Sequence, residues 1–227
     1  LMRSSAASDV YKRQGDYVMI GFYNYTVILT YMGLASSLIG IYLAMSGSHI
    51  TMAVIALMIS GLCDMFDGKV ARTRKRTDDE KKFGIQIDSL CDLICFGLLP
   101  AAIGYSVGMN KFYHIAIMIF FTLAALIRLA YFNVAEESRQ VRTSEARREY
   151  EGLPVTSVAL ILPLFYSFRK DMGALFPDIY AFLLLLIGAA FITRFRLKKP
   201  KMKTMLIFIA VGAAEMIWLI YKVKNNG

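Results

Sequence analysis

Long apolar runs separated by short polar segments make up most of this chain of 227 residues. A helix needs about 20 apolar residues to cross the hydrocarbon core of a bilayer, and runs near that length recur along the sequence. The pattern therefore predicts an all-α integral membrane protein, a bundle of about seven transmembrane helices (six to eight). The expected spans are residues 26–45, 50–73, 85–107, 112–133, 153–168, 175–193 and 204–221.

The composition agrees with this pattern and favours a single domain. Hydrophobic residues account for 57% of the chain, which is typical of a membrane protein. Residues 1–14 contain no apolar core, so they do not resemble a signal peptide. We expect residues 1–14 to be a non-native or disordered leader and residues 15–227 to form one transmembrane domain.

Basic residues are unevenly divided between the two sets of loops that alternate along the predicted spans. Fifteen Lys and Arg residues fall on one side and five on the other, and basic loops face the cytosol. The net charge of +9 is thus explained by topology and does not call for a nucleic-acid partner. We expect a multi-pass protein of the cell membrane. The fifteen are Arg74, Lys75, Arg76, Lys81, Lys82, Arg139, Arg142, Arg147, Arg148, Arg194, Arg196, Lys198, Lys199, Lys201 and Lys203.

Four aspartates interrupt the second and third apolar runs near this basic side. Asp64 and Asp67 are three residues apart, and Asp88 and Asp92 are four apart, so each pair shares one face of a helix. Buried carboxylates need compensating cations, and their oxygens suit magnesium or manganese. The pattern predicts a divalent-metal site that faces the cytosol. The simpler alternative, helix caps or solvated surface charges, suits Asp78 and its charged neighbours better.

Three cysteines, Cys63, Cys91 and Cys95, lie in or beside apolar spans without the spacing of a metal-binding pair. We interpret them as reduced packing residues.

The aspartates belong to a longer motif, D-x2-D-G-x2-A-R followed by G-x3-D-x3-D. This motif resembles the signature of the CDP-alcohol phosphotransferases, membrane enzymes that make phospholipids. One departure is the segment 73–83, which is three residues longer than the family's usual spacing. We expect the surplus, a charged stretch, to lengthen the cytosolic connection between two helices.

The resemblance implies the metal chemistry of the site. Asp64, Asp67 and Asp88 would be ligands of two divalent ions, Mg²⁺ or Mn²⁺. Asp92 would be a ligand as well and would also be the catalytic base that accepts the proton of the acceptor hydroxyl.

The resemblance also implies how CDP-diacylglycerol binds. Asp67, Gly68 and Ala71 would lie against the nucleotide, and Arg72 would bind phosphate oxygens. Gly84 would allow close helix packing at the mouth of the cleft.

Two further stretches resemble bacterial and archaeal phosphatidylserine synthases, namely R-L-A-Y-F-N at 128–133 and Y-E-G-L-P at 150–154. They make Arg128, Asn133, Gly152 and Pro154 candidate acceptor-binding residues. Two ordinary alternatives stay open. Asn133 could be a C-terminal helix cap, and Gly152 to Pro154 could be a turn that starts a helix.

The combined prediction is an enzyme that transfers the phosphatidyl group of CDP-diacylglycerol to L-serine, giving phosphatidylserine and CMP. An alternative is the same chemistry with glycerol-3-phosphate, inositol phosphate or phosphatidylglycerol as acceptor. A distant alternative is an ion transporter, because intramembrane carboxylates also mark ion paths. The resemblance further implies a homodimer among membrane lipids.

Overall fold

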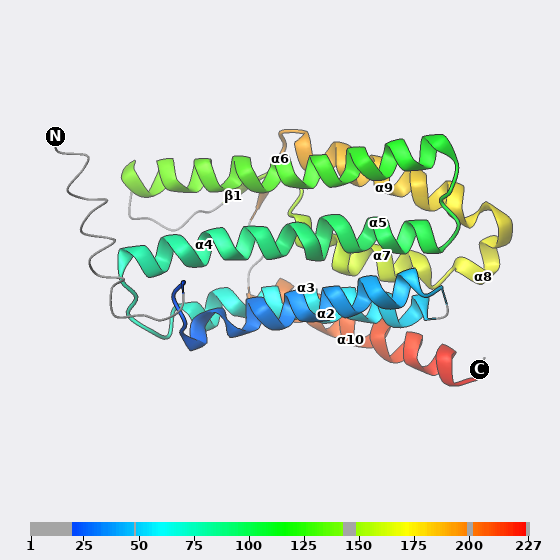
Figure 1. Ribbon diagram of the computed structural model, residues 1–227, viewed down its shortest axis with the longest axis horizontal. Coiled ribbons are helices and arrows are strands. Elements are labelled where there is room, and N and C mark those ends of the chain that lie inside the picture. Colours follow the sequence, from blue (N-terminus) through cyan, green and yellow to red (C-terminus); the bar gives the residue numbers. More distant parts are fainter. Residues whose placement is uncertain (1–19, 48, 143–148, 199–201, 226–227) are drawn as a thin grey trace.

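The computed structural model describes residues 20–47, 49–142, 149–198 and 202–225. The predicted leader, residues 1–14, lies outside the described residues. Figure 1 shows an elongated bundle in which the long helices run roughly along one axis.

The first half of the chain forms a helical hairpin followed by one long, composite helix. Helices α2 (Ile28–Met45) and α3 (Ile50–Ala71) make the hairpin, preceded by a short 3-10 turn, η1 (Tyr25–Val27). Helix α4 (Asp78–Asp92) continues through a π-helical segment, η2 (Leu93–Leu98), into α5 (Leu99–Ser106).

The second half adds long helices α6 (Phe112–Arg142), α9 (Phe176–Ile192) and α10 (Met202–Asn225). Between them lie the shorter elements η3 (Val155–Ser157), α7 (Val158–Tyr166), α8 (Arg169–Met172) and η4 (Gly173–Leu175). Strands β1 (Glu149–Glu151) and β2 (Arg196–Lys198) form a small antiparallel ribbon with Tyr150 opposite Leu197.

The prediction of an all-α membrane bundle is confirmed. Five helices in the described part of the chain are long and apolar enough to cross a membrane, and two shorter apolar helices accompany them. The shorter pair, Val155–Tyr166 and Ile207–Tyr221, falls where the fifth and seventh spans were expected. At 1.5 Å per residue the first of these covers only about 18 Å, less than the hydrocarbon core of about 30 Å.

Two predicted helix bounds were wrong. The third long helix begins at Asp78, not at residue 85, because Thr77 and Glu80 form a capping box at its start. Part of the charged stretch read as a loop is therefore helical. Helix α6 continues past Asn133 to Arg142, which excludes Asn133 as a C-terminal cap.

Small residues let the helices approach closely. A Cβ on Gly61 of α3 would lie 2.4 Å from the Cβ of Ala159 on α7, and one on Gly40 of α2 would lie 2.9 Å from the Cβ of Ala56 on α3. The Ser37 hydroxyl of α2 and the Ser60 hydroxyl of α3 lie 2.7 Å apart and form a hydrogen bond. Such contacts are a main source of helix association in lipid.

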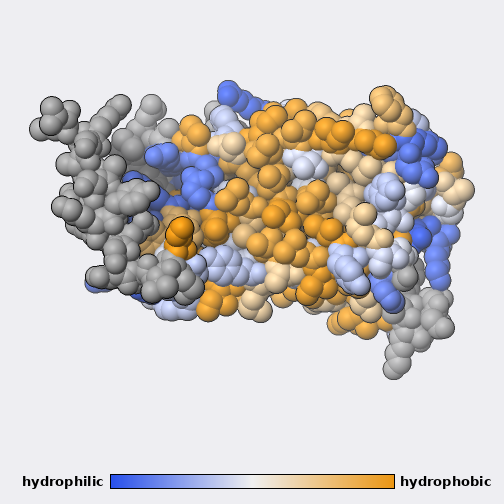
Figure 2. Space-filling model, viewed as in Figure 1, coloured by the Kyte–Doolittle hydropathy of each residue, from blue (hydrophilic) through white to orange (hydrophobic). Residues whose placement is uncertain are grey.

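The surface matches a membrane setting. Figure 2 shows a broad hydrophobic band across the middle of the molecule, with hydrophilic residues toward both ends. Many large apolar side chains are exposed, including Tyr42, Ile119 and Leu186, which is expected of a surface in contact with lipid.

A polar cluster joins α6 to α9 at the end of the bundle that holds the α5–α6 turn. Asp178 accepts hydrogen bonds from the Lys111 ammonium at 3.1 Å and the Tyr113 hydroxyl at 2.5 Å, and its Oδ1 lies 2.9 Å from Nε2 of His114. The bonds to Tyr113 and Asp178 raise the pKa of Lys111 above its ordinary value.

Candidate active site

The two aspartate pairs meet where the C-terminal part of α3 faces the last turns of α4, about midway along the composite helix that runs from Asp78 to Ser106. Carboxylate oxygens of Asp64, Asp88 and Asp92 all lie within 4.8 Å of one another, and the three residues are partly buried. Three hard oxygen donors at this spacing are a donor set that suits Mg²⁺, Mn²⁺ or Ca²⁺. The residues therefore fit the metal that the motif implies.

Asp67 lies beside this group and is more deeply buried. Thr30 of α2 donates a hydrogen bond from Oγ1 to Oδ2 of Asp67 at 3.3 Å. The Asp67 carboxyl also interacts with the Asp88 carboxyl and with the backbone of Gly68. Thr30 was missed by the sequence analysis, since a threonine in an apolar helix gives no signal of a site.

The helix carrying Asp88 and Asp92 changes its winding directly after Asp92. The π-helical segment Leu93–Leu98 adds a residue to a turn, a distortion frequent at functional sites. Thr122 of α6 donates from Oγ1 to the Gly97 carbonyl at 3.2 Å. This bond gives an acceptor in the distorted segment a partner inside the bundle.

Of the residues expected to face the nucleotide, Gly68, Ala71 and Arg72 lie on an open side of α3, whereas Asp67 is buried. A Cβ placed on Gly68 would meet no atom within 4 Å, and Gly68 is exposed. Ala71 is the last residue of α3, and Arg72 is its exposed C-cap. The backbone beside the aspartates is thus accessible to a ligand.

Gly84, which was expected to allow close helix packing, faces the side chain of Arg76. Among the described residues, the atom nearest to a Cβ on Gly84 would be Nη1 of Arg76, at 3.2 Å. A second guanidinium, which the motif did not indicate, therefore lies close to the start of the aspartate-bearing helix.

Asn133 of α6 reaches the aspartate-bearing helix through Ser89. The amide Nδ2 of Asn133 donates to Oγ of Ser89 at 2.8 Å, and the Ser89 hydroxyl is 3.1 Å from Oδ1 of Asn133. Ser89 follows Asp88 directly, so this predicted acceptor residue lies beside the carboxylate cluster. Ser89 itself was not singled out by the sequence analysis.

Arg128 is 6% exposed and holds the turn that precedes α7. It donates from Nε to the Leu153 carbonyl at 3.2 Å and from Nη2 to the Gly152 carbonyl at 3.5 Å. Gly152 has φ +74°, and a Cβ there would lie 3.0 Å from the Thr193 carbonyl oxygen. Pro154 caps η3. The structure brings Arg128 and Gly152 together and gives Gly152 and Pro154 the helix-starting role weighed as an alternative.

The fold and the site define a class: an integral membrane protein in which aspartates from two membrane helices gather in one cluster. The model of the CDP-alcohol phosphatidyltransferase family matches residues 23–223, and the chain belongs to that family.

Three curated relatives sharpen the comparison. The chain is 40% identical over 125 residues to the CDP-diacylglycerol–serine O-phosphatidyltransferase of Saccharomyces cerevisiae (54% of this chain, 44% of the relative). It is 30% identical over 152 residues to the archaetidylserine synthase of Methanothermobacter thermautotrophicus (66% and 61%). It is 34% identical over 121 residues to the CDP-diacylglycerol–serine O-phosphatidyltransferase of Helicobacter pylori (52% and 47%). The matched part is about half the length of these relatives.

We expect Asp88→Asn to weaken divalent-metal binding by about tenfold or more, because changes even in the shell around metal ligands cost 10–100-fold. Mn²⁺ titration of the purified protein, followed by electron paramagnetic resonance, measures this without turnover. Asp79→Asn is the matched control, since Asp79 lies exposed on the same helix. Equal Mn²⁺ affinity in the two variants would contradict the assignment.

Proposed function

We propose that this chain is a membrane enzyme that transfers the phosphatidyl group of CDP-diacylglycerol to L-serine, releasing CMP. The observation that carries the proposal is the convergence of Asp64, Asp88 and Asp92 from two helices of an apolar bundle. There a lipid-linked diphosphate can reach the carboxylates while its acyl chains stay in the bilayer. The named activities of the relatives support serine as acceptor.

The binding roles follow from the open side of α3. Arg72, which is the exposed C-cap of α3, would bind phosphate oxygens through its planar guanidinium. Gly68 leaves room for the nucleotide beside Asp67. Asp64, Asp67, Asp88 and Asp92 would hold two divalent ions, Mg²⁺ or Mn²⁺, which when bound would neutralise the diphosphate and the leaving oxygen.

The transfer itself is a displacement at phosphorus. The serine hydroxyl oxygen forms a bond to the phosphatidyl phosphorus, and the bond from that phosphorus to the CMP oxygen breaks. Asp92, as general base, accepts the hydroxyl proton. Ser89 directly follows Asp88 and accepts a hydrogen bond from Asn133. This contact supports an acceptor pocket between α4 and α6. For Arg128 we retain the acceptor role only indirectly, through the turn containing Gly152 and Pro154 that it holds.

We further propose that residues 15–227 form one domain in the cell membrane with the aspartates facing the cytosol. The α3–α4 connection and the end of α6 lie at the same end of the bundle (Figure 1), and both are rich in Lys and Arg. A homodimer is proposed from family resemblance.

An assay with CDP-diacylglycerol and each candidate acceptor tests the proposal directly. The purified protein should form phosphatidylserine with L-serine and little product with glycerol-3-phosphate, inositol phosphate or phosphatidylglycerol. Lipid mass spectrometry identifies the product. A dominant product from another acceptor would reassign the substrate, and cation flux without any lipid product would favour the transporter alternative.

Asn133 and Arg128 should differ in their kinetic effects. Asn133→Ala removes the partner of Ser89 beside the cluster, so we expect KM for serine to rise more than KM for CDP-diacylglycerol. Arg128→Ala leaves the Gly152 and Leu153 carbonyls without a donor, so we expect lower thermal stability, by about 1–3 kcal/mol. Saturation curves for both substrates and a thermal melt separate the two effects. Unchanged serine saturation in Asn133→Ala would remove Asn133 from the pocket.

Topology can be tested with single cysteines in a background lacking Cys63, Cys91 and Cys95, all of which are buried and free. A cysteine replacing Lys75, in the α3–α4 connection, should react only with reagent that enters the cytosol. One replacing Lys170, in α8 near the opposite end, should react from outside intact cells. The reverse labelling pattern would invert the orientation.

A further inference from the structure

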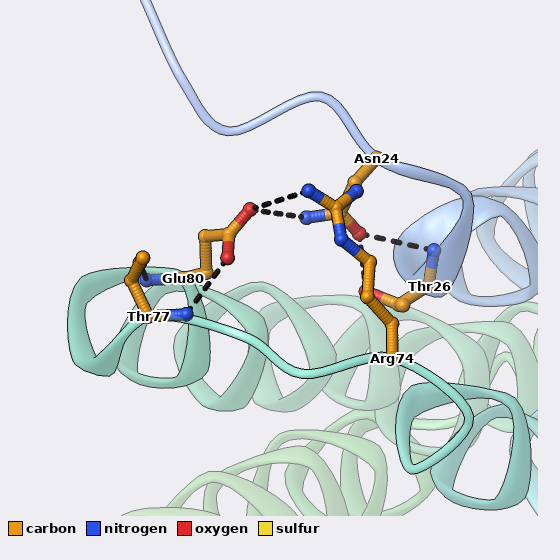
Figure 3. Close-up of polar contacts among 5 residues, drawn as sticks. All are labelled: Asn24, Thr26, Arg74, Thr77 and Glu80. Atoms are coloured by element: carbon orange, nitrogen blue, oxygen red, sulfur yellow. Dashed lines mark hydrogen bonds and ion pairs between the residues drawn. The ribbon is translucent and has the colours of Figure 1, made fainter.

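One acidic side chain, Glu80, makes several polar contacts around the connection between α3 and α4. Figure 3 shows Glu80, in the first turn of α4, facing Asn24, which precedes η1, and Arg74 and Thr77 of the connection itself. Glu80 falls within the stretch that is longer than the family's usual spacing. The role of this stretch is not explained by the metal site or by the motif.

Both oxygens of Glu80 are used. Oε1 accepts from Nδ2 of Asn24 at 3.3 Å and from Nη2 of Arg74 at 3.5 Å. Oε2 accepts from the backbone N–H of Thr77 at 2.8 Å. The Glu80 side chain is 14% exposed and that of Arg74 is 42% exposed, so the ion pair is partly open to water and its contribution is modest.

Two neighbouring contacts hold the same segments together. The Tyr25 hydroxyl lies 3.0 Å from Oγ1 of Thr73, the residue that follows Arg72. The rings of Phe22 and Phe83 meet edge to face at 5.5 Å. The chain from residue 22 to 26 is therefore tied to Thr73, near the start of the connection, and to Phe83, in the second turn of α4.

The contacts around Glu80 are connected to the candidate site in two ways. Residues 24–27 run directly into α2, whose Thr30 donates to Asp67. The second connection runs through Thr73, which directly follows Arg72 in the chain. A contact at Glu80 thus bears on Arg72 and on the helix beside Asp67, although Glu80 is not among the carboxylates that form the cluster.

We propose that Glu80 is a positioning residue that fixes the α3–α4 connection against residues 22–26 and so presents Arg72 for the CDP-lipid diphosphate. This inference rests on the proposed function. An ordered connection lowers the entropy lost when the lipid substrate binds. Loss of Glu80 should therefore act mainly on the KM for CDP-diacylglycerol, with kcat and the KM for serine little changed.

Glu80→Gln separates this role from simple helix capping. Glutamine serves at this position of a capping box as well as glutamate does, so the start of α4 is preserved. Its amide nitrogen cannot accept from Arg74 and Asn24 while the oxygen serves Thr77. Asp79→Asn is the matched control, because it removes one charge from the same helical turn and leaves the five residues drawn in Figure 3 unchanged.

We expect Glu80→Gln to raise the KM for CDP-diacylglycerol about threefold to fivefold, the size expected for a lost ion pair. Asn24→Ala should give part of this effect, and the double variant should be less than additive. Asp79→Asn should match the wild type. A Glu80→Gln enzyme with the wild-type KM for the lipid would overturn the proposal, because capping alone would then explain Glu80.

Limited trypsin digestion provides a readout that needs no turnover. The connection contains Arg74, Lys75 and Arg76, and cleavage there should be faster in Glu80→Gln than in the wild type or Asp79→Asn, since cleavage reports local opening. Equal cleavage rates would also overturn the proposal. If the wild type made no phosphatidylserine, the proposed function would fail, while digestion and CDP-diacylglycerol affinity would still decide the role of Glu80.

Discussion

The mutual approach of four carboxylates in a largely apolar bundle is the constraint on which the rest of the structure depends. Asp64, Asp88 and Asp92 place oxygens within 4.8 Å of one another, and Asp67 joins them through Asp88. Like charges at this spacing repel, and partial burial removes water that would screen them. The arrangement therefore favours binding of a cation and needs a scaffold stiff enough to hold two helices together.

The scaffold supplies that stiffness through close contact between small residues. Gly61 against Ala159 and Gly40 against Ala56 leave no room for larger side chains. The Ser37–Ser60 pair adds a hydrogen bond in the same region, between α2 and α3. Helix α2 thereby packs closely against α3 and places Thr30 at Asp67. Helix α6 contacts α4 through the hydrogen bond between Asn133 and Ser89.

The two ends of the bundle differ in what their polar groups do. At the end with the α5–α6 turn, Asp178 is paired with Lys111, Tyr113 and His114. Its carboxylate therefore joins α9 to the start of α6. Toward the α3–α4 connection the aspartates face one another, and exposed Gly68 and Arg72 follow Asp67 along α3. Compensated charge suits a structural junction, whereas converging like charge suits a ligand site.

Hydrophobic run length and motif spacing were enough to predict the membrane bundle, the helices that carry the aspartates and the family. These properties are local, because a span needs only enough consecutive apolar residues and a helix face follows from a spacing of three or four. The capping box that starts α4 at Asp78 was also readable in the sequence, but the charged residues around it suggested a loop. Only the tertiary structure decided that Thr30 meets Asp67, that Ser89 meets Asn133, and that Arg128 holds the turn at Gly152. Each of these contacts joins residues far apart in the chain, and their pairing depends on how whole helices pack, which no local pattern specifies.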